Sequence, residues 1–184
     1  MLKNTLARYG AFTKTIHWAT AILVIGMLCA GLYMTGMDAG LEKLKLYNLH
    51  KSIGVAILAL VVLRILWHAW SKPPAFVASL KPWEKRAAKT VHFLLYCCLL
   101  AMPLSGWVMS SAAGRPVQFF GLFTLPDLVP HDHEGIRIFF HDAHAYIGWF
   151  LIFLIFMHVA AALKHHVIDK DPTLRRMLPF AKGE

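Results

Sequence analysis

The chain has 184 residues, of which 58% are hydrophobic and 16% are charged, and its formal net charge is +9. The apolar share is above the roughly one half or less that is usual in soluble domains, and the mean hydropathy is +0.53, so an ordinary soluble enzyme is excluded. The basic residues lie at the ends of apolar segments and form no basic domain, which argues against a nucleic-acid partner and favours contacts with lipid headgroups.

Four apolar segments follow one another along the chain. A helix that crosses the hydrocarbon core needs about 20 mostly apolar residues, and this length is reached at 12–36, 47–70, 88–112 and 138–166. The first segment is longer than the apolar region of a signal peptide, so it is interpreted as a retained helix. We therefore expect an all-α membrane protein, a four-transmembrane-helix bundle that forms a single domain over residues 1–184.

The distribution of Lys and Arg predicts the orientation. With four spans, the N-terminal tail, the connection between spans two and three and the C-terminal tail share one side, and this side holds most of the basic residues. The positive-inside rule then predicts that both termini are cytoplasmic. On the opposite side, the longest connection, 113–137, has room for a short surface helix.

Histidines occur in all four spans, although ionisable side chains are rare in hydrocarbon and suggest a function by default. His144 and His158 in the fourth span are 14 residues apart. This is nearly four helical turns, so both lie on about the same helix face, roughly 21 Å apart along the axis. One metal cannot bind both side chains, so the spacing predicts two separate centres.

The topology places a partner at the depth of each of these histidines. His17 lies near the cytoplasmic side, like His158, and His50 lies near the outer side, like His144. A b-type haem is held by two axial nitrogens without covalent attachment, whereas a structural zinc usually takes four protein ligands. The pairs His17/His158 and His50/His144 therefore predict two b haems, with edges on the order of 10 Å apart. No C-x-x-C-H motif for covalent haem attachment exists.

The remaining histidines have other interpretations. His92 falls in the layer of His17 and His158, where it could bond a haem propionate or a quinone, and His141 lies off the face shared by His144 and His158. Solvated positions at the cytoplasmic interface or in the outer loop are expected for His68, His165, His166, His131 and His133. For any single histidine, a hydrogen-bonded packing role is the alternative.

Several stretches resemble the bacterial cytochrome b561 family. These are TIHWATAILV, LHKSIGVAILALVVLRILWHAWSKPP, LLYCCLLAMPLSGWVMS and, most specific, HVAAALKHHVIDKDPTLRRMLP, and together they cover nearly the whole chain. The resemblance implies a four-helix bundle with two b haems in the bacterial inner membrane. It also implies that the haem-iron ligands are His17, His50, His144 and His158, the same four residues that the depths selected.

One branch of that family is similar to this chain in length and lacks extra domains. The resemblance to it implies an oxidoreductase that passes electrons from periplasmic superoxide to ubiquinone near the cytoplasmic face. The quinone candidates are then His165, Lys72 and Arg64. Basic residues on the outer side could attract the superoxide anion, although they could also bind haem propionates or lipid headgroups. These residues are Lys43, Lys45, Lys51, Arg115 and Arg137.

Two alternatives remain open. The chain could be a membrane-anchor subunit that carries electrons between a periplasmic dehydrogenase or hydrogenase and the quinone pool, with the mixed-charge outer loop as a docking face. It could also be a structural membrane protein whose histidines only pack.

Overall fold

Four long helices make up most of the computed structural model, which describes residues 1–179. They are α1 (Ala11–Thr35), α2 (Leu41–Trp70), α3 (Pro82–Ala112) and α4 (Glu134–Val167). Each is long and apolar enough to cross a membrane, which confirms the prediction of an all-α four-helix membrane protein. The last five positions of the expected domain, 180–184, lie outside the described residues.

The helices extend beyond the predicted spans at their N-terminal ends. α2 begins at Leu41 rather than 47, α3 at Pro82 rather than 88, and α4 at Glu134 rather than 138. Hydropathy locates only the part of a helix that lies in hydrocarbon, whereas backbone hydrogen bonding continues through the polar turns outside it. The helices therefore contain residues 12–35, 47–70, 88–112 and 138–166 of the predicted spans, and three of them begin four or six residues earlier.

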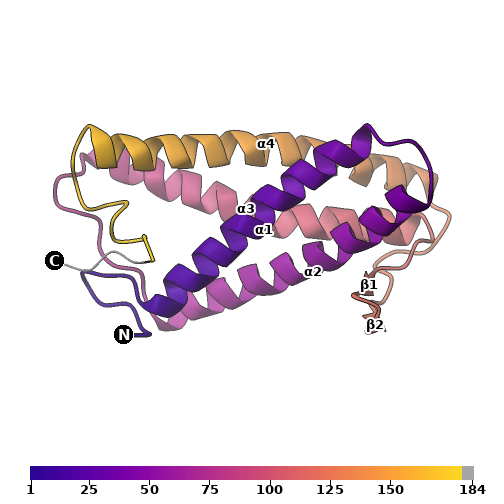
Figure 1. Ribbon diagram of the computed structural model, residues 1–184, viewed down its shortest axis with the longest axis horizontal. Helices are drawn as coiled ribbons and strands as arrows, with labels where there is room; N and C mark the ends of the chain where they lie inside the picture. Colours follow the sequence, from indigo (N-terminus) through magenta and orange to yellow (C-terminus); the bar gives the residue numbers. More distant parts are fainter. Residues whose placement is uncertain (180–184) are drawn as a thin grey trace.

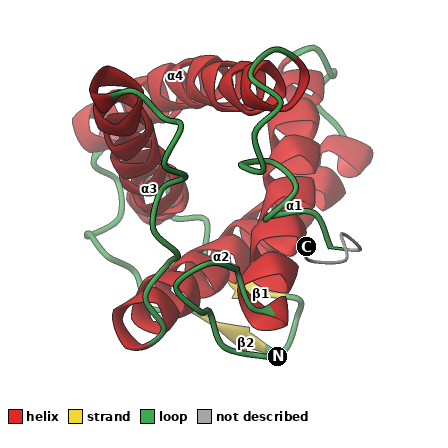
Figure 2. Cartoon of the chain, turned by 90° about the vertical axis from the view of Figure 1, so that its left-hand side faces the viewer, coloured by secondary structure: helices red, strands yellow, loops and turns green. Residues whose placement is uncertain are grey.

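The four helices form a ring when viewed from the end of the bundle (Figure 2). α3 packs along α4, and α2 packs against both α1 and α3. An apolar cluster occupies the middle of the bundle and draws on all four helices: Val24, Ile57, Val61, Cys98, Leu151 and Leu154. In α2 these residues lie between His50 and His68, and in α4 they lie between His144 and His158.

Pro179, the last described residue, lines one cavity together with Met1, so the N-terminal and C-terminal segments lie at the same end of the bundle (Figure 1). The C-terminal segment is fastened to α1, because Trp18 Nε1 donates to the Met177 carbonyl at 2.9 Å and Lys14 Nζ donates to the Leu178 carbonyl at 2.9 Å. Thr13, which is 1% exposed, links the N-terminal segment to α2 by accepting a hydrogen bond from Trp67 Nε1 and donating one to Asn4. This end is therefore closed by polar contacts among segments that are distant in sequence.

The connection between α3 and α4 differs from the expected short helix. It forms an antiparallel hairpin of β1 (Gln118–Phe119) and β2 (Phe123–Thr124), in which Gln118 pairs with Thr124 and Phe119 with Phe123. The turn between the strands places Gly121 at φ 74°, a left-handed conformation that glycine adopts without steric cost. The expectation of a helix was wrong because this turn reverses the chain before a helical turn can form.

Candidate functional site

Two pairs of imidazole rings face each other inside the bundle. His17 of α1 and His158 of α4 have ring centres 6.3 Å apart with an angle of 62° between the planes. His50 of α2 and His144 of α4 have ring centres 6.4 Å apart at 65°. These are the two pairs that the topology predicts, and each joins helices that are far apart in sequence.

The spacing suits one metal atom between the two rings of each pair. A bond from metal to imidazole nitrogen is about 2.0 Å, and the ring centre lies about 1 Å behind that nitrogen, so two rings on opposite sides of a metal have centres roughly 6 Å apart. The observed separations of 6.3 and 6.4 Å agree with this arithmetic. The ring separations are therefore compatible with one metal atom held between the two imidazoles of each pair.

The surroundings fit an iron porphyrin better than a bare metal. Among the described residues, neither histidine pair belongs to a group of three or more side chains that could jointly ligate one ion. Zinc would require such a group, whereas a haem supplies four equatorial nitrogens of its own and needs only two from the protein. The central cluster described above lies between the two layers, so each layer is bounded by apolar side chains on the side that faces the other, which suits the apolar ring of a porphyrin.

His144 is oriented by a residue that sequence reasoning missed. Ser105 Oγ lies 3.0 Å from His144 Nδ1 and donates its own hydrogen to the Met102 carbonyl at 2.8 Å. Because the hydroxyl donates to Met102, it accepts from His144, so that Nδ1 carries the proton. Nε2 then keeps its lone pair for a metal, which is the usual role of a hydrogen bond to the far nitrogen of a ligating histidine.

A glycine next to this serine makes room for the ring. A Cβ at Gly106 would lie 3.2 Å from His144 Cε1, closer than nearly all real contacts of that kind. The Ser105–Gly106 pair in α3 therefore both bonds and accommodates the His144 imidazole. The sequence shows Ser105 and Gly106 as two consecutive small residues inside a span, but nothing in the local sequence indicates that they contact His144.

The layer of His17 and His158, on the side that the sequence predicts to be cytoplasmic, contains a third imidazole. His92 of α3 has its ring centre 5.2 Å from that of His158, at 62°, so it approaches His158 more closely than His17 does. His17 Nδ1 is buried and has no hydrogen-bond partner among the described residues. The structure thus places His92 in the layer where the sequence located it, as a neighbour of the pair.

Arg64 also belongs to this layer. It lies within electrostatic range of His17, His92 and His158, and its guanidinium carbon is 5.5 Å from the centre of the Tyr96 ring. Its Nε is buried without a hydrogen-bond partner in the described part of the chain. Of the three quinone candidates, Arg64 is therefore the one that the structure brings next to a histidine pair.

His165 lies instead in a polar cluster where α4 ends. Its Nδ1 is 2.9 Å from carboxylate oxygens of both Asp169 and Asp171, and a second ion pair, Lys164–Glu84 at 2.6 Å, ties α4 to α3. A cavity of about 210 Å³ opens beside these side chains. Burial raises the pKa of the Asp171 carboxyl, but hydrogen bonds from Thr173 and the nearby His165 outweigh it, and the net pKa is below its usual value.

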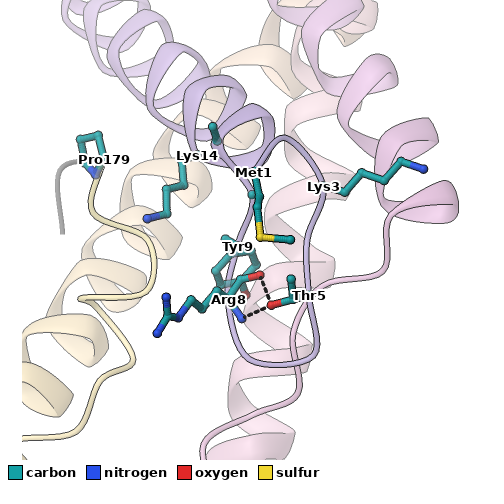
Figure 3. Close-up of a pocket in the computed structure, with 9 residues that line it drawn as sticks. Met1, Lys3, Thr5, Arg8, Tyr9, Lys14 and Pro179 are labelled. Carbon is teal, nitrogen blue, oxygen red and sulfur yellow. Dashed lines mark hydrogen bonds between the residues drawn. The ribbon is translucent and has the colours of Figure 1, made fainter. Parts of the chain in front are cut away.

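Lys72 lies at the same end of the bundle as the basic N-terminal segment, because Asn4 is hydrogen-bonded to Ser71. Lys72 is exposed just beyond α2. A further cavity of about 280 Å³ lies between the N-terminal segment and Pro179 (Figure 3), and its lining includes Lys3, Arg8 and Lys14 but no carboxylate. Tyr9 borders it, and burial raises the pKa of this phenol while Arg64 opposes the shift. This cavity contains no histidine, so it is separate from the two imidazole layers.

The five basic residues that the sequence assigns to the outer side fall into two groups, according to whether they are paired with a carboxylate. Lys45 and Arg137 are paired with carboxylates of their own helices, Glu42 and Glu134. The others, Lys43, Lys51 and Arg115, have no carboxylate partner among the described residues, and the Lys43 and Lys51 ammonium groups donate to backbone carbonyls at 2.7 and 2.9 Å. Lys51 and Arg115 are close enough to interact electrostatically, so the outer positive charge concentrates there.

Comparison with known proteins gives consistent matches over nearly the full length. The family model described as prokaryotic cytochrome b561 matches residues 8–180. "Cytochrome b561 homolog 2" of Escherichia coli (strain K12) is 40% identical over 95% of this chain and 93% of its own length. "Cytochrome b561 homolog 1" of the same organism is 30% identical over 93% and 98%. "Probable superoxide oxidase CybB" of Yersinia pestis is 28% identical over 96% and 98%.

Proposed function

Because this chain belongs to the prokaryotic cytochrome b561 family, whose members bind b-type haem and transfer electrons across membranes, we propose that it holds two b haems and oxidises superoxide with ubiquinone as the acceptor. It would do so as one membrane domain spanning residues 1–184 of the bacterial inner membrane, with both termini in the cytoplasm. The excess of Lys and Arg at the end that carries both termini supports this orientation.

The observation that carries the proposal is the pair of imidazole spacings, 6.3 Å for His17/His158 and 6.4 Å for His50/His144. Each pair would supply the axial ligands of one haem iron. When bound, a bis-histidine b haem supplies a one-electron carrier. The protein contributes the fixed ligand distance, the orientation of His144 by Ser105, and an apolar interior that excludes water from the path between the two layers.

The choice of superoxide as donor is supported by charge and by one relative. Lys51 directly follows His50 in the chain and interacts electrostatically with Arg115, and cationic surfaces raise the association rate of small anions. A relative at 28% identity is named a probable superoxide oxidase. In the proposed reaction two superoxide anions are oxidised to dioxygen, and one ubiquinone takes up the two electrons and two protons to become ubiquinol.

For the acceptor, the cytoplasmic layer offers polar groups beside an apolar, lipid-exposed bundle. Arg64 and Tyr96 lie next to His92 and the His17/His158 pair, and a guanidinium with an unsatisfied buried nitrogen is a suitable donor to a quinone carbonyl. We assign Arg64 the primary quinone contact. His165 and Lys72 lie nearer the aqueous surface and would deliver the protons that the reduction of ubiquinone consumes.

The proposal is tested by a reduced-minus-oxidised absorbance spectrum of the purified protein with haem quantitation. Two b haems per chain are expected, and His144→Ala should lose one haem and keep the other. Rapid mixing with superoxide should then reduce the haems, and added ubiquinone should reoxidise them. Two haems without superoxide reduction would instead favour an anchor subunit that receives electrons from a periplasmic dehydrogenase or hydrogenase. A colourless protein would refute both functions.

A further inference from the structure

The β1–β2 hairpin carries an apolar tip that the electron-transfer proposal does not use. Residues 117–126, VQFFGLFTLP, contain no charged side chain, although Arg115 lies just before this segment and Asp127 directly after it. Three large apolar side chains near the turn are exposed: Phe120 by 51%, Leu122 by 77% and Phe123 by 56%. Such a group of apolar side chains is unfavourable in water and marks a surface that meets another apolar phase.

The hairpin is fixed at its base, so it cannot fold its tip back onto the bundle. Ser52 Oγ of α2 donates to the Gln118 carbonyl at 2.8 Å and accepts from the Phe120 N–H at 3.1 Å. Trp107 Nε1 of α3 donates to the Pro126 carbonyl at 3.0 Å, and Val117 is only 3% exposed. The exposure of the tip is thus imposed by these contacts and is not the result of a loose loop.

The attachment point on α2 determines the depth of the hairpin. α2 has 30 residues, about 45 Å at 1.5 Å per residue, which is longer than the hydrocarbon thickness of about 30 Å. Trp70 ends the helix, 66% exposed and with Lys3 Nζ 3.8 Å from its ring centre, as is typical of the cytoplasmic interface. Counting about 20 residues back from Trp70 reaches the outer hydrocarbon boundary near His50, so Ser52 lies at or inside it.

The views of the molecule place the hairpin laterally rather than above the bundle. In Figure 1 it lies beside the outer part of α2 and does not extend past the end of the bundle, and in Figure 2 it lies outside the ring of helices. Its tip is therefore continuous with the lipid-facing surface of the transmembrane helices. Tyr47, which is 38% exposed and five residues nearer the outside than Ser52, is a suitable aromatic for the outer interface.

We propose that the β1–β2 hairpin is an interfacial anchor whose tip, Phe120, Leu122 and Phe123, inserts among the acyl chains of the outer leaflet. Lys51 and Arg115 flank the hairpin base, with Lys51 Nζ on the Pro116 carbonyl, and so lie at the aqueous edge of the same leaflet. An apolar tip with basic residues beside it is the composition of interfacial anchors. The anchor holds the outer connection at a constant depth next to the His50/His144 pair.

The test compares thiol accessibility at the tip with that at a matched position in water. Leu122→Cys is placed in the haem-loaded protein in liposomes, with Glu42→Cys as the control, because Glu42 is exposed in the first turn of the same helix α2. A charged, membrane-impermeant maleimide is added, and modification is followed for each peptide by mass spectrometry, so that the native cysteines can remain. The haem spectrum verifies that each variant is folded.

We expect Leu122→Cys to react at least about tenfold more slowly than Glu42→Cys, because maleimide requires a hydrated thiolate, and the two to react alike in denaturing detergent. A diazirine on the lipid acyl chain should form photoadducts on the peptide that contains residues 117–126. Equal rates in liposomes would overturn the proposal. Slow maleimide modification of Leu122→Cys without lipid photoadducts, together with crosslinks between two chains at this peptide, would also overturn the proposal. It would show that the tip is covered by a second copy of the chain.

Discussion

Removing the hydrogen bond between Ser105 and His144 should lower the affinity of the His50/His144 site for haem while both histidines remain in place. In Ser105→Ala the His144 Nδ1–H loses the hydroxyl that accepts it at 3.0 Å. Ser105 is only 4% exposed, so water does not reach the position easily. The imidazole keeps its nitrogen lone pair but is no longer oriented by this contact.

The magnitude follows from the loss of one hydrogen bond, because the Met102 carbonyl remains within hydrogen-bonding range of the His144 imidazole. One such bond contributes about 0.5–1.5 kcal/mol net, and each 1.4 kcal/mol is about a factor of ten in an equilibrium constant. We therefore expect the affinity of the outer site for haem to fall by roughly 2- to 12-fold, which reaches the lower end of the range of about 10- to 100-fold seen for similar partners of metal-binding histidines. The cytoplasmic site should keep its affinity, since none of its histidines contacts Ser105.

Haem titration into the apoprotein, followed by absorbance, measures the two affinities. Ser110→Ala is the matched control, because it removes a buried hydroxyl from the same helix without touching a histidine. If Ser105→Ala binds the second haem within about twofold of the wild type while Ser110→Ala does the same, the assigned tautomer and the orienting role of Ser105 are refuted. A loss in both variants would point to a general effect on α3.

Three further outcomes follow from the geometry. Gly106→Ala should lower the affinity of the outer haem site in the same titration, because the added Cβ would lie 3.2 Å from the His144 ring, whereas Gly26→Ala, with open space at its Cβ, should leave it unchanged. Lys51→Gln should slow haem reduction by superoxide most strongly at low salt, as stopped-flow mixing would show, while Lys45→Gln should have little effect because Glu42 already pairs with that lysine. The lowered pKa of Asp171 means that its carboxylate stabilises the C-terminal segment at neutral pH and that this stability is lost as the pH falls below the ordinary Asp value of 3.8. The hydrogen-exchange protection of residues 169–179, corrected for the intrinsic pH dependence of exchange, should fall there in the wild type and change less in Asp171→Asn.

The helices were predictable from the sequence because hydrocarbon imposes a length and a composition on each span, and no tertiary contact is needed to satisfy either. The histidine pairing was also accessible, since the 14 residues between His144 and His158 fix one helix face and the topology fixes the depth of His17 and His50. The ring separations agree with that pairing, and ligation itself stays a prediction.

What the sequence could not provide depends on contacts between distant segments. The hairpin forms because Ser52, 66 residues before Gln118, bonds its backbone, and the local pattern of apolar residues is compatible with helix or strand. The role of Ser105 depends on His144 from another helix. His165 was expected to be solvated or near a quinone, but Asp169 and Asp171 fold back onto it, which no spacing rule predicts.

The apolar cluster in the middle of the bundle has a consequence for the energy balance of the cell. Val61 is fully buried, and Leu151 and Leu154 are 2% and 3% exposed, so this layer is packed with apolar side chains. A proton or metal ion would have to give up its hydration to cross it, at a large cost in free energy, whereas an electron can tunnel through packed side chains. The six residues that hold the helices together therefore also insulate the membrane, and they permit charge to cross only in the form of electrons.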